Sequence, residues 1–296
     1  MLRKLYSRPL YRLGRETVLG FIDDGVLSHG AAIAFFTVTS MAPLLLVVTA
    51  VAGLAFGNSA AKKAIVDQLS GLTGPESVGF FQSVLENASS KSSGTIASVV
   101  GLITLLITVS GVFGEMQSAL NAIWKVKVQP TTVSRLVRAR AISFGLVVAL
   151  GFLLMTSLSV SAALASLGEY FQRNWQGLGL AVLILNFLLS FVFIAAMFAA
   201  IFKVLPDRKL EWRDVFIGAF ASSGLFSFGK YLIAIYLGTS GIATIYGAAG
   251  TLILLLFWVY YSVQILLLGA EFTKAYAQVY GSRKTEPSLR TKVVKI

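Results

Sequence analysis

The sequence predicts an all-α polytopic membrane protein, a bundle of six transmembrane helices with both chain termini in the cytoplasm. Three observations support this fold class. Apolar residues make up 56% of the chain and charged residues only 13%, whereas soluble domains carry about 25% charged residues. Six apolar runs are long enough to cross a bilayer, which takes about 20 residues. Lys and Arg gather in alternate segments between these runs.

The six predicted spans define a membrane domain and two flanking segments. Runs such as SFVFIAAMFAAIF have no polar face that could meet water. We expect a cytoplasmic N-terminal segment at 1–29, a membrane domain at 30–270 with a structured outer loop at 58–93, and a cytoplasmic tail at 271–296. The spans are 30–57, 94–114, 141–167, 178–205, 215–237 and 244–270.

The basic residues predict how the chain is oriented in the membrane. A formal net charge of +12 is typical of a nucleic-acid-binding protein or of a membrane protein with basic cytoplasmic loops. Alternate segments hold 20 basic residues against 4. Because the excess of Lys and Arg marks cytoplasmic loops, both termini are expected in the cytoplasm. This alternation accounts for every basic residue except Lys230, so no nucleic-acid partner is needed.

Two connecting segments are predicted to be helical. After Pro75, apolar residues recur at helical spacing up to Leu85, which indicates a short amphipathic helix at 75–87 on the outer surface. In EMQSALNAIWKVK, Met116, Leu120, Ile123 and Trp124 share a face, so a helix is expected to reach the cytoplasmic interface with Trp as its anchor. Both helices can seal the bundle or bind a partner.

Three separated motifs resemble the YihY/BrkB family of bacterial inner-membrane proteins. They are AIAFFTVTSMAPLLLVV at 32–48, ALNAIWKV at 119–126 and ATIYGAAGTLILLLFWVYYSVQILLLGAEF at 243–272. The resemblance implies a six-helix bundle in the inner membrane and a role in translocating envelope components. The family also carries the labels virulence factor and ribonuclease BN.

The sequence offers little for an enzyme. Metal-dependent hydrolysis needs clustered His, Asp or Glu ligands, and the chain has a single histidine and no cysteine. Asp23, Asp24 and His29 form the nearest approach to a cluster, and helix capping at the membrane interface explains them as well. We therefore expect no metal site, no cofactor and no enzymatic activity.

Pro43 lies inside the first predicted span. A proline in a helix removes one hydrogen bond and clashes with the carbonyl group four residues earlier, here that of Thr39. We expect the hydroxyl groups of Thr37, Thr39 and Ser40 to satisfy the freed carbonyl. Pro43 is then either a hinge or a static kink.

Glu115 and Glu271 each follow a glycine, in GVFGEMQ and LLLGAEF, near the expected cytoplasmic ends of two spans. They are expected to pair with Lys or Arg of the second loop or the tail, or to form a cytoplasmic gate. Because no Asp or Glu lies inside a predicted span, the sequence argues against proton coupling.

Lys230 is a full charge within the fifth predicted span. A charge at the centre of a membrane helix costs about 2.5–3.5 kcal/mol on insertion scales. Three explanations stay open: snorkelling to lipid phosphates, pairing with Glu169, or an anion-binding site. Asn186, Ser157 and Ser161 are neutral polar residues at the same predicted depth and could line such a site.

The sequence thus predicts a multi-pass transporter or flippase-like translocator of the bacterial inner membrane. Its substrate would be an anionic lipid or envelope precursor, bound by Lys230, Asn186, Ser157 and Ser161. The alternative is a membrane scaffold or envelope assembly factor that does not transport. Membrane lipids are the expected partners, and the oligomeric state stays open.

Overall fold

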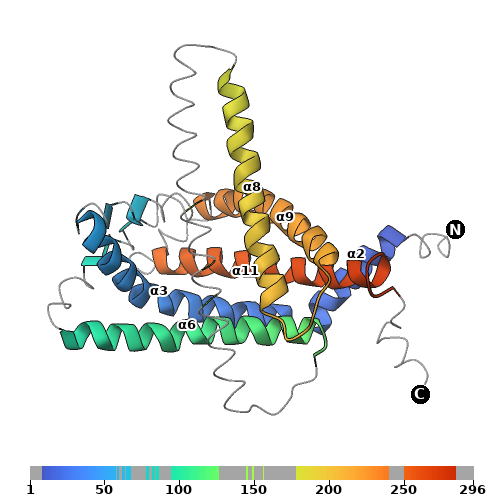
Figure 1. Cartoon of the computed structure of the whole chain (residues 1–296), viewed down its shortest axis with the longest axis horizontal. Helices are drawn as coiled ribbons and strands as arrows, with labels where there is room; N and C mark the ends of the chain where they lie inside the picture. The colour runs from blue at the N-terminus through green and yellow to red at the C-terminus, as the bar shows by residue number, and fades with distance from the viewer. Residues whose placement is uncertain are drawn as a thin grey trace. The chain divides into compact units, whose positions relative to one another are not determined.

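A computed structural model of the chain describes residues 9–57, 95–126, 178–239 and 250–284, with one to three residues at a time between 59 and 86 and single positions between 145 and 156. The described residues form helices and turns and contain no strand, as the predicted fold class requires. Figure 1 shows the helices coloured along the chain from α2 to α11. The third predicted span, 141–167, lies almost wholly outside the described residues.

The N-terminal part of the chain folds into two successive helices, α2 (Pro9–Asp23) and α3 (Val26–Phe56). Pro9 opens α2, where a missing N–H is tolerated. The chain turns at Asp24 and Gly25, and Gly25 has a φ of 64°, a left-handed conformation that glycine adopts without strain. α2 was not predicted from the sequence, and it exposes Leu10 and Ile22 beside basic residues.

Four further long helices follow, and they lie where four of the predicted spans were placed. Three stretches in them are long and apolar enough to cross a membrane: Ile184–Val204, Trp212–Ile233 and Leu252–Val279. A fourth span is counted if α2 and the first part of α3 form one broken span. Six spans and the orientation of the termini stay predictions. The four helices are α6 (Thr95–Ile123), α8 (Leu178–Val204), α9 (Trp212–Thr239) and α11 (Gly250–Val279).

Two helices continue beyond the ends predicted from the sequence. α6 runs to Ile123 and α11 to Val279, so the placement of Glu115 and Glu271 at helix ends was wrong. Glu271 lies inside the apolar stretch Leu252–Val279, which removes the sequence argument against proton coupling. Glycine next to each acid suggested a boundary. It does not end either helix, because the residues that follow keep an apolar face and bury it, as at Leu120 and Ala275.

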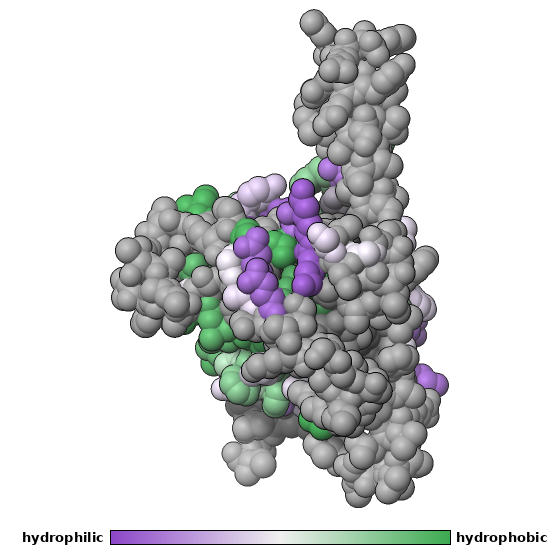
Figure 2. All heavy atoms as spheres, turned by 90° about the vertical axis from the view of Figure 1, so that its left-hand side faces the viewer, coloured by the Kyte–Doolittle hydropathy of each residue, from purple (hydrophilic) through white to green (hydrophobic). Residues whose placement is uncertain are grey.

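The chain divides into two compact units. Unit 1 comprises Met1–Val26, Gln117–Ser227 and Ile265–Ile296, and unit 2 comprises Leu27–Met116 and Phe228–Gln264. On the face drawn in Figure 2, hydrophilic and hydrophobic described residues lie side by side.

Within unit 1, α9 and α11 pack through two reciprocal glycine contacts. A Cβ atom on Gly218 would lie 2.7 Å from Cβ of Thr273, and one on Gly269 would lie 2.8 Å from Cβ of Ser222. The Ser222 and Thr273 hydroxyl groups each donate to the carbonyl of the glycine four residues earlier in their own helix, at 2.7 Å. Glycine therefore allows the two helices to approach closely, as small residues do in membrane proteins.

Within unit 2, an apolar cluster joins α9 to α11. Ile233 and Leu254 are buried, and Trp258 and Tyr261 pack against them.

Candidate functional site

Four charged residues of unit 1 form a largely buried ionic site, which we call the charge cluster. Its members are Asp24, Lys125, Glu271 and Lys274. The side chains of both acids are 1% exposed and that of Lys274 is 14% exposed, whereas that of Lys125 is 44% exposed. Lys125 is therefore the member that solvent or a ligand reaches most easily.

Local backbone structure places each member of the charge cluster. Asp24 occupies the turn after α2, where its N–H donates to the carbonyl of Gly20 at 2.9 Å. Lys125 follows the last turn of α6 with a φ of 51°. Its N–H donates to the carbonyl of Ala122 at 3.0 Å. Glu271 and Lys274 are three residues apart on α11, a spacing that brings two side chains of a helix together.

The two lysines occupy both oxygens of Asp24. The Lys274 ammonium donates to Oδ2 of Asp24 at 2.8 Å and to Oε2 of Glu271 at 3.0 Å. The Lys125 ammonium donates to Oδ1 of Asp24. A single ammonium group thus bridges two buried carboxyl groups, and among the described residues the second ammonium group binds Asp24 alone.

Glu271 is the most enclosed residue of the charge cluster, since the residue as a whole, backbone included, is 0% exposed. Its Oε1 atom is buried and has no hydrogen-bond partner in the described part of the chain. A Cβ atom on Gly20 would lie 2.9 Å from Cδ of Glu271. The Glu271 carboxyl group therefore packs directly against α2 at a glycine.

Asp24 lies in a turn between two helices, and its pKa is shifted. Burial disfavours the charged form and acts to raise the pKa of Asp24, but the neighbouring Glu271 carboxyl group and the hydrogen bonds from Lys125 and Lys274 outweigh burial and lower the pKa below its usual value. Asp24 is consequently a carboxylate, and it needs its ammonium partners because a buried unpaired charge is costly.

A polar clamp holds the end of α6, which carries Lys125, against the turn between α8 and α9. The side-chain amides of Asn121 and Gln117 donate to Asp207 at 2.8 and 3.1 Å. The N–H of Asp207 donates back to Asn121 at 2.9 Å. Arg208 donates to the carbonyl of Trp124 at 2.8 Å. The position of Lys125 is thus set by several bonds next to it.

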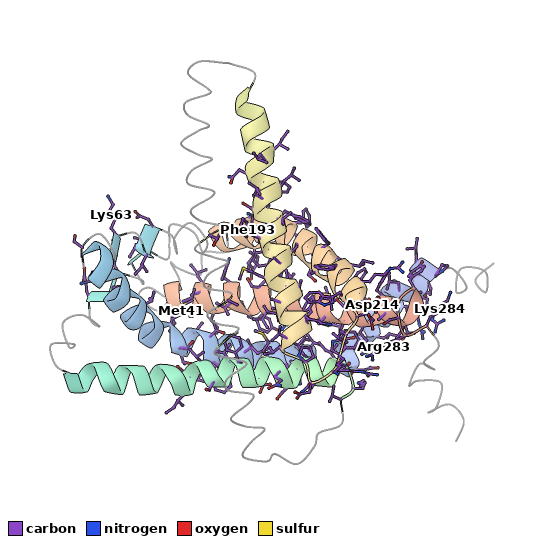
Figure 3. The ribbon with its side chains drawn as sticks, in the orientation of Figure 1. Met41, Lys63, Phe193, Asp214, Arg283 and Lys284 are labelled. Atoms are coloured by element: carbon purple, nitrogen blue, oxygen red, sulfur yellow. The ribbon has the colours of Figure 1, made fainter. Side chains whose placement is uncertain are left out.

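A second clamp fixes the end of α11, which carries Glu271 and Lys274. Ser282 donates its hydroxyl proton to Oδ2 of Asp214 at 2.6 Å. The Arg283 guanidinium group lies over the ring of Trp124, 5.3 Å from its centre. Asp214, near the start of α9, and Arg283, beyond α11, are both labelled in Figure 3.

The acids and the histidine singled out from the sequence do not form a metal site. His29 Nδ1 lies 2.6 Å from Oε1 of Glu115, which links α3 to α6 within unit 2. The arginines of the second loop lie outside the described residues, so the expected pairing of Glu115 with a basic residue of that loop or the tail stays a prediction. The described residues hold no group of three His, Cys, Asp or Glu that could bind a metal ion.

The backbone around Pro43 is helical, and the hydroxyl groups before it do not satisfy the freed carbonyl of Thr39. Thr37 donates to Ile33 at 2.7 Å and Ser40 donates to Thr37 at 2.8 Å. Thr39 donates to carbonyls three and four residues earlier. That expectation was wrong, because a hydroxyl in a helix reaches back along the chain.

Lys230 is exposed, and its ammonium group lies 5.2 Å from the centre of the neighbouring Tyr231 ring, which is itself 59% exposed. Asn186 is half-buried on α8, and its Oδ1 has no hydrogen-bond partner in the described part of the chain. Ser157, Ser161 and Glu169 lie outside the described residues. The structure thus gives no grouping of these predicted site residues.

The charge cluster was not recognised from the sequence, although its members were all seen there. Lys125 and Lys274 were counted as cytoplasmic charges of the second loop and the tail, which were expected to pair with Glu271. The ion pair of Glu271 with Lys274 confirms that expectation. Asp24 was considered only with His29. The signal that could have found the site is the spacing of Glu271 and Lys274 on a helix whose apolar pattern continues to Val279.

Long apolar helices, three of them able to cross a membrane, and an ionic site buried among them define an integral membrane protein. The model of the family described as virulence factor BrkB matches residues 17–292. The chain belongs to this family, as the three sequence motifs predicted.

Curated relatives of the chain are UPF0761 membrane proteins. One from Rhodospirillum centenum is 29% identical over 92% of this chain and 60% of its own length. One from Ralstonia nicotianae is 29% identical over 97% of this chain and 62% of its own length. One from Alteromonas mediterranea is 30% identical over 65% of this chain and 64% of its own length. The chain thus spans less than two thirds of the length of these relatives. No solved structure matches the chain.

Proposed function

We propose that this membrane protein is a translocator of an anionic lipid or anionic envelope precursor in the bacterial inner membrane. It crosses the membrane several times with both termini in the cytoplasm, and it needs no cofactor and catalyses no reaction. The observation that carries the proposal is the charge cluster, because ionisable groups buried among membrane helices are costly and are typical of substrate and ion pathways.

The unequal burial within the charge cluster suggests how an anion is bound. Lys274 is almost enclosed and holds both carboxyl groups, whereas Lys125 is 44% exposed and holds only Asp24. An anionic headgroup would compete with Asp24 for Lys125. A charge-assisted hydrogen bond of this kind contributes about 1.5–3 kcal/mol.

Exposed apolar side chains on α8 favour an amphiphilic substrate. Ile184, Leu185, Phe187 and Leu188 are each about half exposed, with values of 46–54%. Such a surface suits contact with acyl chains, so a lipid can keep its chains in the membrane while its headgroup reaches a polar site.

The site residues predicted from the sequence keep their proposed roles. Lys230 and Asn186, with Ser157 and Ser161, would meet the headgroup elsewhere on its path. Pro43, Glu115 and Glu271 would take part in a hinge or gate, Glu115 through its bond to His29 and Glu271 through the charge cluster.

A reconstituted transport assay tests the proposal. Purified protein in vesicles of phosphatidylcholine receives a trace of fluorescent phosphatidylglycerol, and the transfer of the label between leaflets is timed. We expect wild-type protein to exceed protein-free vesicles. Lys125→Gln should transfer the label roughly tenfold to hundredfold more slowly at limiting lipid. Lys209→Gln, a change of another exposed lysine in unit 1, should behave as wild type. Equal transfer with and without protein would end the proposal.

A non-transporting scaffold is the second candidate, and it has one observation in its favour. The described positions between 78 and 86 are helical, with Leu85 buried and Gln82, Ser83 and Glu86 exposed, which gives this segment a polar outer surface. Deleting 75–87 should abolish capture of a partner if the scaffold function holds. It should leave the lipid transfer rate unchanged if that segment only seals the bundle.

A further inference from the structure

Glu271 has one chemical property that anion binding at Lys125 does not use. Its Oε1 is a fully buried carboxyl oxygen without a hydrogen-bond partner in the described chain. The other oxygen, Oε2, is held by Lys274 at 3.0 Å. Asp24, by contrast, has a lysine on each of its oxygens. The two acids of the charge cluster are thus unequally satisfied.

We propose that Glu271 is a proton-binding site that fills when Lys125 leaves Asp24 for an anionic substrate, so that translocation is coupled to proton movement. The coupling rests on the proposed function, whereas the proton site itself does not. In the binding step, a hydronium ion of the surrounding water gives its proton to Oε1 of Glu271 and becomes water, and the Glu271 carboxyl group becomes neutral.

The charge balance of the cluster gives the reason for this coupling. With Asp24 and Glu271 ionised and both lysines in place, two negative charges face two positive charges. When the substrate takes Lys125, two buried carboxylates share the single ammonium of Lys274. One proton on Glu271 restores neutrality, and a buried uncompensated charge is otherwise strongly unfavourable.

The groups that surround Glu271 favour a proton over a metal cation. Lys274 already occupies the position between the two carboxyl groups, at 2.8 and 3.0 Å from their oxygens. From the adjoining segment, α2 places the backbone at Gly20 against the Glu271 carboxyl group, and the turn after it contributes Asp24. Lys125, just after the end of α6, donates its hydrogen bond to Asp24. A proton needs no further ligands or space.

The geometry also keeps the two carboxyl groups together when the proton is added. The Lys274 ammonium joins one oxygen of Asp24 to one oxygen of Glu271, and Asp24 stays a carboxylate because Lys274 still holds it. Two carboxyl groups that share one proton are a recurring arrangement at sites that exchange protons.

Infrared difference spectroscopy tests the proton site directly. Protein in phosphatidylcholine vesicles is compared between alkaline and acidic pH, with and without short-chain phosphatidylglycerol. We expect the C=O stretch of a protonated carboxyl group to appear on acidification and to shift when the glutamates carry ¹³C. Glu271→Gln should lose the band, and Glu211→Gln, a change of an exposed acid, should keep it.

The phosphatidylglycerol arm tests the coupling. Adding this lipid at constant pH should increase the band in wild-type protein and leave it unchanged in Lys125→Gln. A pH gradient across the vesicles should alter the lipid transfer rate severalfold in wild type and not in Glu271→Gln. A pH-dependent glutamate band without any lipid transfer would keep the proton site and remove the proposed function.

Two results would overturn the proposal. One is a protonated carboxyl band that survives in Glu271→Gln, and the other is the absence of any glutamate band in labelled wild type. If Glu271→Gln does not fold, Glu271→Asp replaces it, and the band should then move from the glutamate label to an aspartate label. A band that stays with the glutamate label in Glu271→Asp would contradict the assignment equally.

Discussion

Replacing Lys274 by methionine removes the one ammonium group that bridges two buried carboxyl groups. In the wild type this group lies 2.8 Å from Asp24 and 3.0 Å from Glu271, and both acids are 1% exposed. Methionine retains most of the apolar volume of the side chain and none of its charge. The change therefore isolates the electrostatic contribution of Lys274.

The burial of the cluster sets the expected magnitude. Breaking a buried ion pair by removing one partner costs about 3–5 kcal/mol, because the remaining charge is uncompensated. Lys125 is 44% exposed, and Asp24 keeps Lys274 when Lys125 is removed, so Lys125→Gln leaves no buried carboxylate without an ammonium partner. We therefore expect Lys274→Met to lower the free energy of unfolding several times more than Lys125→Gln does.

A double-mutant cycle checks the physical reason. In the Glu271→Gln background Asp24 is the one carboxylate left in the charge cluster, and Lys125 still binds it. Lys274→Met should therefore cost less in this background, by about 1–3 kcal/mol. Unfolding in detergent, followed by tryptophan fluorescence, supplies the four free energies. Equal destabilisation by Lys274→Met and Lys125→Gln, or strict additivity in the cycle, would refute the account of the cluster.

Two further predictions concern helix contacts within the units. Gly218→Ala places a Cβ atom 2.7 Å from Cβ of Thr273. The overpacking should destabilise the protein by about 1–3 kcal/mol, and the higher helix propensity of alanine offsets about 1 kcal/mol of this loss. Gly224→Ala, on the same helix with its nearest neighbour at 4.0 Å, should leave the unfolding midpoint equal or higher, and a matching loss in both variants would contradict the packing argument. His29→Ala and Glu115→Gln should each lower the midpoint by a similar amount and the double variant by no more than either, because they remove one bond of 2.6 Å. Additive losses would show that Glu115 has another partner.

The fold class could be predicted from the sequence because the membrane imposes strong patterns. Apolar runs long enough to cross the bilayer must be helical, since no water is present to satisfy an open backbone. The helices α8 and α9 accordingly lie within a few residues of two predicted spans. Three motifs spread over the chain were enough to predict the family.

The candidate site could not be predicted in the same way, because it depends on which segments meet. Asp24 precedes Glu271 by most of the chain length, and only the folded chain brings them to one ammonium group. Lys230 attracted attention as a lone charge within a span, yet it is exposed beside Tyr231. The helix end near Glu271 was placed too early, since glycine was taken as a boundary where it serves packing.

The selectivity of lipid transfer tests the central claim most directly. Vesicles containing the protein are given labelled phosphatidylglycerol and labelled phosphatidylcholine in parallel, and the ratio of their transfer rates is measured for wild type and Lys125→Gln. If the charge cluster binds an anionic headgroup, the ratio should exceed one in wild type and fall toward one in Lys125→Gln. A ratio near one in wild type, or the same ratio in both proteins, would contradict the account.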